Sequence, residues 1–197
     1  MRLLDGIRAA THEPHKRLHE HPITNPLVSS ELALTHYHLV IAAFEGFYTA
    51  LALQTPETYI DCLSLPALRK DTIALGIPTP LLPPCNLPTI INNTSSALGM
   101  LYVIEGSRLG GLMIAKNVRE TLMLNESNGL AFFSGRGKNT APQWKIFLQR
   151  LTHECDDTER CITAAQQTFL LLEQWLWTVW NERQSEITRM TKRRELA

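Results

Sequence analysis

Apolar side chains recur along this chain at intervals of three and four residues, and runs that alternate apolar and polar positions in the manner of strands are missing. Spacing of three and four places apolar residues on one face of an α-helix. The first clear pattern predicts a helix from Glu31 to about Gln54, with Ser30 as its N-cap. The residues expected to anchor this helix in a core are Leu32, Tyr37, Val40, Phe44 and Phe47.

The second half of the chain carries three further helical patterns. One runs from Thr94 to Lys116, and a second begins at Thr140, has Pro142 in its first turn and ends near Cys155. Asp156 or Asp157 is placed to cap the third and longest helix. We therefore expect an all-α fold. The apolar residues of the last helix include Phe169, Leu170, Leu171, Leu172, Trp175, Trp177 and Trp180.

A proline-rich segment, residues 76–93, is the one break in this helical texture. Neither a helix nor an inner strand persists through closely spaced prolines. The part of the chain before the segment would make a poor independent core, so we expect a surface loop inside a single domain spanning residues 1–197. The prolines are Pro78, Pro80, Pro83, Pro84 and Pro88.

Composition excludes some classes of protein. Nineteen basic and nineteen acidic residues give a formal net charge of zero, and hydrophobic residues reach 44% against 19% charged. Disorder requires low hydrophobicity and high net charge, so it is excluded. A nucleic-acid-binding protein should show a basic surplus, which is missing here.

The N-terminus is charged from Arg2 onward and lacks the apolar region of a signal peptide. The apolar stretch from Ile41 to Leu53 is interrupted by Glu45 and is shorter than a membrane span. We expect a cytoplasmic protein without membrane association, a monomer or a weak homodimer. Its four cysteines form no C-x-x-C pair and are expected to be reduced and mostly buried. They are Cys62, Cys85, Cys155 and Cys161.

Four histidines lie close together near the N-terminus: His12, His15, His19 and His21. No cysteine or acidic partner completes a zinc site, and such a cluster can also be exposed polar surface. At 100° per residue, however, His15 and His19 share one helix face with Arg8 and Thr11. A histidine on that face could ligate iron, and the arginine could meet an anionic ligand edge. Pro14 is expected to kink this helix unless it lies in the first turn.

Seven of the ten glycines fall between Gly99 and Gly137, several of them inside a helical pattern. A glycine in a helix interior costs about 0.5–1 kcal/mol relative to alanine. Gly106 and Gly110 are four residues apart and open the same face. Two interpretations remain: a close crossing with another helix, or a flat ligand lying on exposed backbone. Tyr102, four residues before Gly106, projects from that face and could reach a polar group of such a ligand.

Four segments together resemble the heme oxygenase family, specifically its bacterial, biliverdin-producing branch. Residues 4–18 (L-x-x-x-R-x-x-T-x-x-x-H-x-x-L) resemble its proximal helix, and residues 105–111 (E-G-S-x-L-G-G) resemble its distal helix. Residues 131–137 (A-F-F-S-G-R-G) give a third match, and residues 168–172 (T-F-L-L-L) resemble the start of the long last helix. The third match continues at Thr140, Trp144, Phe147 and Leu151.

The resemblance implies a multihelical bundle with heme between a proximal N-terminal helix and a glycine-kinked distal helix. It implies an oxidoreductase that cleaves heme to biliverdin, carbon monoxide and ferrous iron, with heme as substrate and cofactor and dioxygen as co-substrate. His15 would be the axial ligand of the heme iron. Gly106 and Gly110 would leave room for dioxygen, with Gly111 lining the same face. Ser107 would help to hold the water that delivers protons.

At the heme edge, the resemblance matches Arg8 and Tyr102 to positions that contact the propionates, and Lys145 is a further candidate there. An arginine suits these carboxylates because charge-assisted hydrogen bonds are strong. Electrons would come from an external ferredoxin or reductase, because the chain has no G-x-G-x-x-G nucleotide motif.

The chain departs from the family pattern at two positions. His19 stands where many relatives have a glutamate that supports the proximal histidine, and the glutamate here is Glu20. Ser107 replaces the distal aspartate of vertebrate members. Its neighbour Arg108 is expected to be exposed or paired with an acid.

Three other functions remain open. A heme-handling protein without turnover would need the same histidine and glycines. A di-iron oxidase would need Glu-x-x-His pairs, and the chain contains none. A purely structural helical protein would carry its glycines by accident.

Overall fold

The computed structural model describes residues 2–78 and 81–195, with residues 186–195 described by backbone alone. The described residues form helices and connecting turns, without a strand, which confirms the all-α expectation. The α-helices are α1 (Leu3–Glu20), α2 (Leu34–Ala52), α3 (Leu65–Ala74), α4 (Thr94–Leu122), α5 (Ala131–Ser134), α6 (Thr140–Glu154) and α7 (Thr158–Glu195). Short 3-10 helices are η1 (Asn25–Val28), η2 (Glu57–Leu63) and η3 (Gly137–Asn139).

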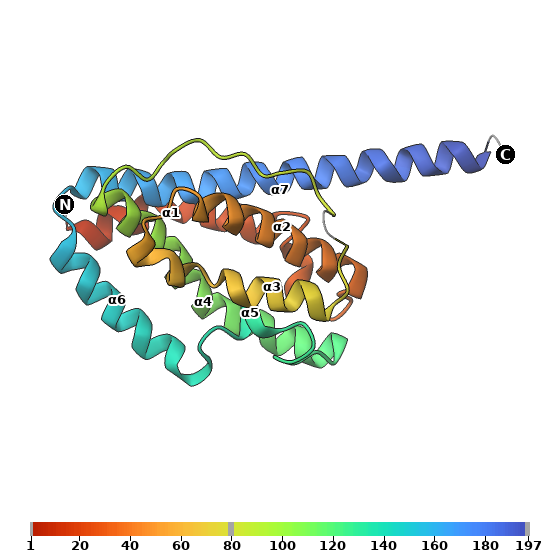
Figure 1. The fold of residues 1–197 in the computed structure, drawn as a ribbon, viewed down its shortest axis with the longest axis horizontal. Helices are drawn as coiled ribbons and strands as arrows, with labels where there is room; N and C mark the ends of the chain where they lie inside the picture. Colours follow the sequence, from red (N-terminus) through yellow and green to blue (C-terminus); the bar gives the residue numbers. More distant parts are fainter. Residues whose placement is uncertain (1, 79–80, 196–197) are drawn as a thin grey trace.

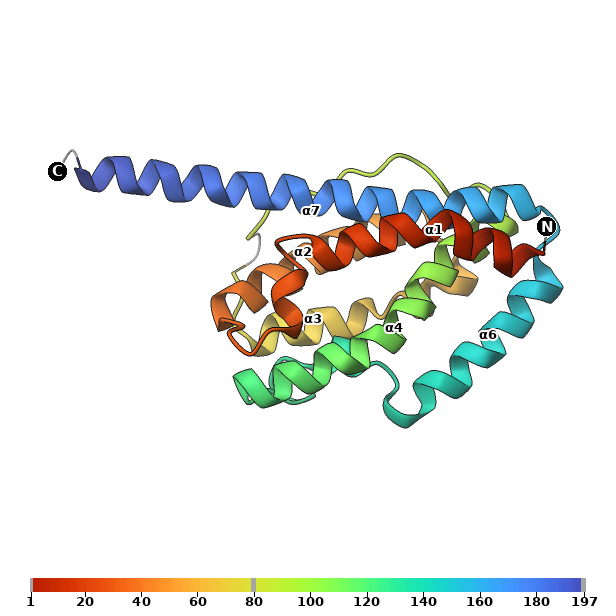
Figure 2. The same ribbon diagram turned by 180° about the vertical axis from the view of Figure 1, so that it is seen from behind.

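Helix α7 is the element on which the others are arranged. It has 38 residues, a length of about 57 Å at 1.5 Å per residue, and its C-terminal part extends past the other helices (Figure 1). Both α1 and α4 pack along α7, while α6 packs on α4 and α2 packs on α3. Figure 2 shows α1 lying along α7, with α4 diverging from both and α6 leading obliquely to the N-terminal end of α7.

Two glycines allow close approach to α7. A Cβ atom at Gly99 of α4 would lie only 2.1 Å from the carbonyl oxygen of Cys161 in α7. In α2, a Cβ atom at Gly46 would lie 3.1 Å from the Trp175 ring, whose Nε1 donates to the carbonyl of Ala43 at 2.8 Å. Helices α4 and α7 therefore contact each other backbone to backbone at Gly99, and the backbone of α2 contacts the Trp175 indole of α7 at Gly46.

The helix starts in the second half of the chain agree with their sequence signals. Asn93 and Ser96 form a capping box at the start of α4, with Ser96 N donating to Asn93 Oδ1 at 2.8 Å. Of the two aspartates before α7, Asp157 is the cap and accepts a first-turn amide at 3.0 Å. Asp156 instead accepts the hydroxyl of Ser95 at 2.5 Å, which links the start of α7 to α4.

The predicted start of α2 is wrong. The helix begins at Leu34 rather than Glu31, and Ser30 does not cap it. The preceding chain is held by α4 instead, because the amide of Asn117 donates to the carbonyls of Leu27 and Ser29 at 3.0 and 2.9 Å. This contact between residues about ninety positions apart outweighs the local capping signal.

Two points about the extent of the other helices follow from the structure. Helix α4 continues past Lys116 to Leu122, and the chain then turns at Met123, which has a left-handed φ of 57°. Pro14 lies inside α1, buried, and the helix runs through it without a break. The shared face expected for α1 is therefore retained.

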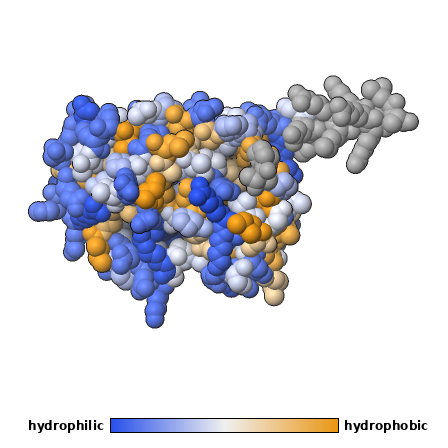
Figure 3. Space-filling model, in the orientation of Figure 1, coloured by the Kyte–Doolittle hydropathy of each residue, from blue (hydrophilic) through white to orange (hydrophobic). Residues whose placement is uncertain are grey.

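The core is one cluster of buried apolar side chains, and the described residues of segment 76–93 form neither helix nor strand. The four cysteines are free thiols, of which Cys161 is fully buried. By length and composition α4 could also cross a membrane, since its most apolar window has a mean hydropathy of 1.2. Half of that window is buried inside the fold, as in core helices of soluble proteins, so this is weak support for a membrane span. On the face seen in Figure 3, apolar residues are interspersed with hydrophilic ones.

We expect Gly99→Ala to destabilise the protein by about 2–4 kcal/mol, because a side chain facing backbone at 2.1 Å cannot be accommodated without moving the helices apart. Gly110→Ala in the same helix is the control, because a Cβ there meets nothing within 4 Å. It should stabilise by up to about 1 kcal/mol through helix propensity. Urea unfolding of the three proteins tests this, and equal midpoints for both variants would contradict the close crossing.

His21, at the C-terminal end of α1, is a buried neutral histidine. It is 2% exposed, its Nδ1 accepts the Ile23 amide at 3.1 Å, and its ring packs edge-on against Trp177 at 4.4 Å. Its Nε2 has no hydrogen-bond partner among the described residues. Burial lowers its pKa below the ordinary 6.5, and the charge of Glu173 opposes this. Protonation would break the bond from Ile23 and bury a charge.

A lowered pKa in the folded state means that the unfolded chain binds more protons below pH 6.5, so stability should be constant above that pH and fall as pH decreases below it. Urea midpoints between pH 8 and pH 5 measure this decline. His21→Asn should reduce its slope, whereas the control His12→Asn, at an exposed position, should keep the full slope. Identical slopes in both variants would contradict the assignment.

Candidate functional site

The face of α1 expected to carry chemistry is divided between core and solvent. Thr11 is buried and donates its hydroxyl to the carbonyl of Ile7 at 2.8 Å. Arg8, His15 and His19 are exposed. The nearest acid to Arg8 is Asp5, with Nη1 4.0 Å from Oδ1 and both side chains more than half exposed. The guanidinium of Arg8 is therefore accessible to another anion.

His15 is held between a second histidine and α7. Its Nε2 lies 3.3 Å from the Nε2 of His19, and its ring contacts Phe169 edge-on at 5.6 Å between centroids. Partial burial lowers the pKa of His15, and the proximity of His19 and His12 lowers it further. The imidazole is therefore neutral at pH 7, the form whose nitrogen lone pair can bind a metal.

The glycines of α4 have three different surroundings. A Cβ at Gly111 would lie 3.2 Å from the carbonyl oxygen of Phe133, so this glycine allows α5 to pack closely. A Cβ at Gly106 would lie 3.4 Å from the Trp144 ring of α6. A Cβ at Gly110 would meet nothing within 4 Å. Close packing thus explains Gly111, whereas Gly110 lies beside open space.

The face that carries Gly106 and Gly110 is an apolar surface. Leu109 and Met113, one turn apart on α4, are 37% and 69% exposed. Trp144 contacts Tyr102 at 5.2 Å between centroids as well as Gly106, so α6 covers the N-terminal end of this face. Tyr102, Gly106 and Gly110 are accordingly brought together, as expected from their spacing.

Ser107 lies beside a residue that sequence reasoning missed. Its hydroxyl donates to the carbonyl of Ile104 at 2.8 Å, and the phenol of Tyr48 in α2 lies near it. Burial raises the pKa of Tyr48 to about 12, which the contacts with Ser107 and Arg108 oppose. The phenol of Tyr48 is therefore a buried, neutral hydroxyl group next to Ser107. Only its buried position in a helical pattern could have drawn attention to it.

Arg108 is paired with an acid, one of the two expected outcomes. Its side chain is 9% exposed, and Nη2 lies 3.5 Å from the carboxylate of Glu105. Glu105 also binds Arg136, in the turn before α6, at 2.6 Å. The Glu105–Arg136 pair is a second feature that the sequence pattern did not reveal.

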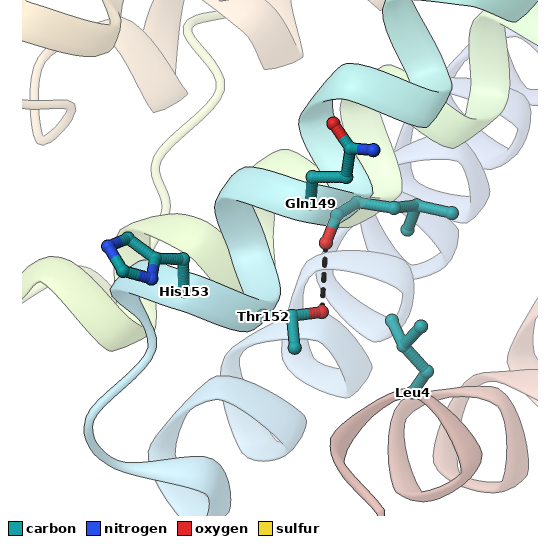
Figure 4. A pocket seen from close by; sticks show the side chains of 5 residues that line it. Leu4, Gln149, Thr152 and His153 are labelled. Atoms are coloured by element: carbon teal, nitrogen blue, oxygen red, sulfur yellow. Dashed lines mark hydrogen bonds between the residues drawn. The ribbon is translucent and has the colours of Figure 1, made fainter.

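An open surface depression of about 510 Å³ lies between the N-terminal part of α1 and α6. Leu4 of α1 faces Thr152 of α6 across it, and Thr152 donates to the carbonyl of Leu148 at 2.9 Å (Figure 4). Leu4 and His15 lie on nearly the same face of α1, three turns apart. Lys145 is exposed on α6. The remaining lining residues are Leu148, Gln149 and His153.

The two halves of the candidate site are therefore on α1 and α4, which both pack on α7. Residues 88–178, which include the glycine face and α6, match the family model for heme oxygenase. The proximal residues on α1 lie outside this matched stretch.

Two similar proteins extend this finding. A heme oxygenase from Xanthomonas campestris pv. campestris is 43% identical over 56 residues, which is 28% of this chain and 32% of that protein. The match thus spans about a third of the length of this curated relative. A crystal structure of a domain of unknown function from Shewanella denitrificans, described as having a heme oxygenase-like fold, superposes with a TM-score of 0.69. That likeness covers 93% of this chain and 94% of the other at 16% identity, so the fold is heme oxygenase-like.

Proposed function

We propose that this protein is a bacterial heme oxygenase. It binds heme between the His15 face of α1 and the glycine face of α4. With dioxygen and electrons from an external ferredoxin or reductase, it cleaves heme to biliverdin, carbon monoxide and ferrous iron.

The observation that carries the proposal is the open space at Gly110. A helix-interior glycine is unfavourable, and packing compensates for this at Gly99, where a Cβ would collide with backbone, and at Gly111, where a Cβ would lie tightly against backbone at 3.2 Å. At Gly110 a Cβ would meet nothing. A planar ligand that lies against the helix backbone would explain why a glycine is retained at position 110. The exposed side chains of Leu109 and Met113 would give that ligand an apolar surface.

The residues of α1 fit heme on the opposite side. The neutral imidazole of His15 would hold the iron through a ring nitrogen, in place of its contact with His19. The exposed guanidinium of Arg8 lies two turns away on the same face and would bind a propionate, with Tyr102 and Lys145 as further contacts at the heme edge. Heme, when bound, supplies the iron that activates dioxygen and is itself the ring that is cleaved.

The remaining groups on the α4 side are suited to holding water and protons. Ser107 presents a hydroxyl whose proton is directed to the Ile104 carbonyl, which leaves its oxygen lone pairs available as acceptors. The phenol of Tyr48 lies near Ser107 and stays protonated at neutral pH. These two hydroxyls would orient water beside the glycine face, where a bulkier side chain would exclude it.

The decisive experiment adds stoichiometric heme, then reductant and oxygen. We expect a histidine-type Soret band on binding, followed by biliverdin, which chromatography identifies by isomer. Gly110→Leu should keep the Soret band but lower the rate of biliverdin formation at least about tenfold, because its side chain would fill the open space beside Gly110 that dioxygen would need. Gly110→Ala, which adds one methyl group, is the milder comparison.

Three results would contradict this proposal. Heme that binds but remains intact would indicate a heme-handling protein. An unchanged optical spectrum on addition of heme would indicate a structural protein. Full turnover in Gly110→Leu would show that the ligand lies elsewhere.

We also expect His15→Ala to abolish the five-coordinate histidine spectrum of the ferric heme complex, because the axial nitrogen is removed. His12→Ala is the matched control: His12 lies three residues away, and its Nδ1 lies 3.1 Å from Glu13 Oε1 on the exposed surface. Electron paramagnetic resonance and optical spectra distinguish the two. Loss of the signal in His19→Ala but not in His15→Ala would show that His19, one turn further along α1, is the iron ligand.

A further inference from the structure

We propose that Arg136 is a positioning residue for the glycine face. Through an ion pair with the buried Glu105 it fixes the part of α4 that carries Gly106 and Ser107. The role of that face rests on the proposed function, whereas the ion pair and its mechanical effect do not.

The pair has a specific geometry. Glu105 is 4% exposed, and its two oxygens accept from Arg136 Nη1 at 2.6 Å and Nη2 at 3.1 Å. Two parallel charge-assisted bonds constrain orientation as well as distance. The partners lie 31 residues apart in the sequence, so the pair joins α4 to the turn that precedes α6.

Arg108 adds a third connection. Its Nη2 lies 3.5 Å from Glu105 Oε1, and it also donates to the carbonyl of Cys62 in η2. The carboxylate of Glu105 is therefore shared by two guanidinium groups, one from its own helix and one from the turn. The carboxylate thus joins α4 to residues 135–137, and Arg108 connects the cluster to η2.

The turn is shaped to present Arg136. Gly135 and Gly137 flank it with φ values of 54°, in the left-handed region that favours glycine. The backbone amide of Arg136 donates to Thr140 Oγ1 at 3.2 Å, which connects the turn to the first residue of α6. The backbone on both sides of Arg136 is thus fixed, which directs its side chain toward α4.

This support is located where α4 is weakest. Gly106, Gly110 and Gly111 lower helix propensity immediately after Glu105, and Gly110 gains no packing on its open side. Movement of this segment relative to the turn would separate a buried carboxylate from its partner, which is strongly unfavourable. The ion pair therefore resists bending or fraying at the residue before the glycine face.

Arg136→Met tests the proposal, with Arg150→Met as the matched control. Arg150 also forms an arginine–glutamate pair, with Glu154 at 2.7 Å within α6, and its guanidinium lies 4.8 Å from the centroid of the Tyr59 ring in η2. The control therefore removes an ion pair and a contact with η2 without touching Glu105. In the heme-free protein we expect amide hydrogen exchange of residues 104–111 to accelerate about tenfold in Arg136→Met and to be unchanged in Arg150→Met. Exchange in residues 165–180 of α7 should be unaffected in both, which separates local positioning from general loss of stability.

The heme complex provides a second readout, with carbon monoxide as a probe ligand of the ferrous iron. The C–O stretching band should shift or broaden in Arg136→Met and match the wild type in Arg150→Met. Arg136→Lys keeps the charge without the bidentate contact and should give intermediate results. If Arg136→Met fails to fold, Arg136→Lys replaces it as the test variant.

Two outcomes would overturn the proposal: exchange in residues 104–111 that is equal in both methionine variants, or accelerated exchange with an unchanged C–O band. If the wild-type protein binds no heme, the proposed function fails, and the exchange experiment still decides whether Arg136 positions this part of α4.

Discussion

The close crossing of α4 and α7 at Gly99 is the constraint on which the candidate site depends. A Cβ at this glycine would lie 2.1 Å from the Cys161 carbonyl, so the two backbones are in direct contact. Helix α1 also packs along α7. Because α1 and α4 both pack on α7, this crossing constrains how far the His15 face lies from the glycine face. A change in this crossing would alter the width of the site without touching any residue in it.

The glycines of α4 show that one residue type serves different purposes within a single helix. Gly99 and Gly111 admit backbone from α7 and α5, Gly106 lies against an indole, and Gly110 borders open space. The sequence interpretation left helix crossing and ligand binding as alternatives for this segment. Close packing occurs at Gly99, Gly106 and Gly111, whereas ligand binding stays a prediction that concerns Gly110, beside open space. A ligand-binding interpretation therefore depends on the glycine that packing leaves unexplained, and not on the number of glycines.

Local signals predicted the parts of this fold that depend on local interactions. The capping position of Asp157 and the extent of α6 from Thr140 agree with the structure because each depends on residues within one or two turns. The start of α2 was missed because Asn117 holds the preceding chain from about ninety residues away. Tyr48 and Arg136 were missed for the same reason: each acquires its position from a partner on another element, and no periodicity records such a pairing.

A formal net charge of zero conceals how the charges near the candidate site are distributed. Arg108 and Arg136 share the single carboxylate of Glu105, which leaves one positive charge in excess among largely buried groups. Replacing such a cluster by apolar side chains is often neutral or stabilising, so stability alone gives little reason to retain it. What apolar side chains cannot supply is a fixed orientation, and the cluster lies one residue before the segment of α4 with the weakest helix propensity. The ion pairs are therefore better explained by the geometry that they impose on Gly106 and Ser107 than by the stability that they contribute.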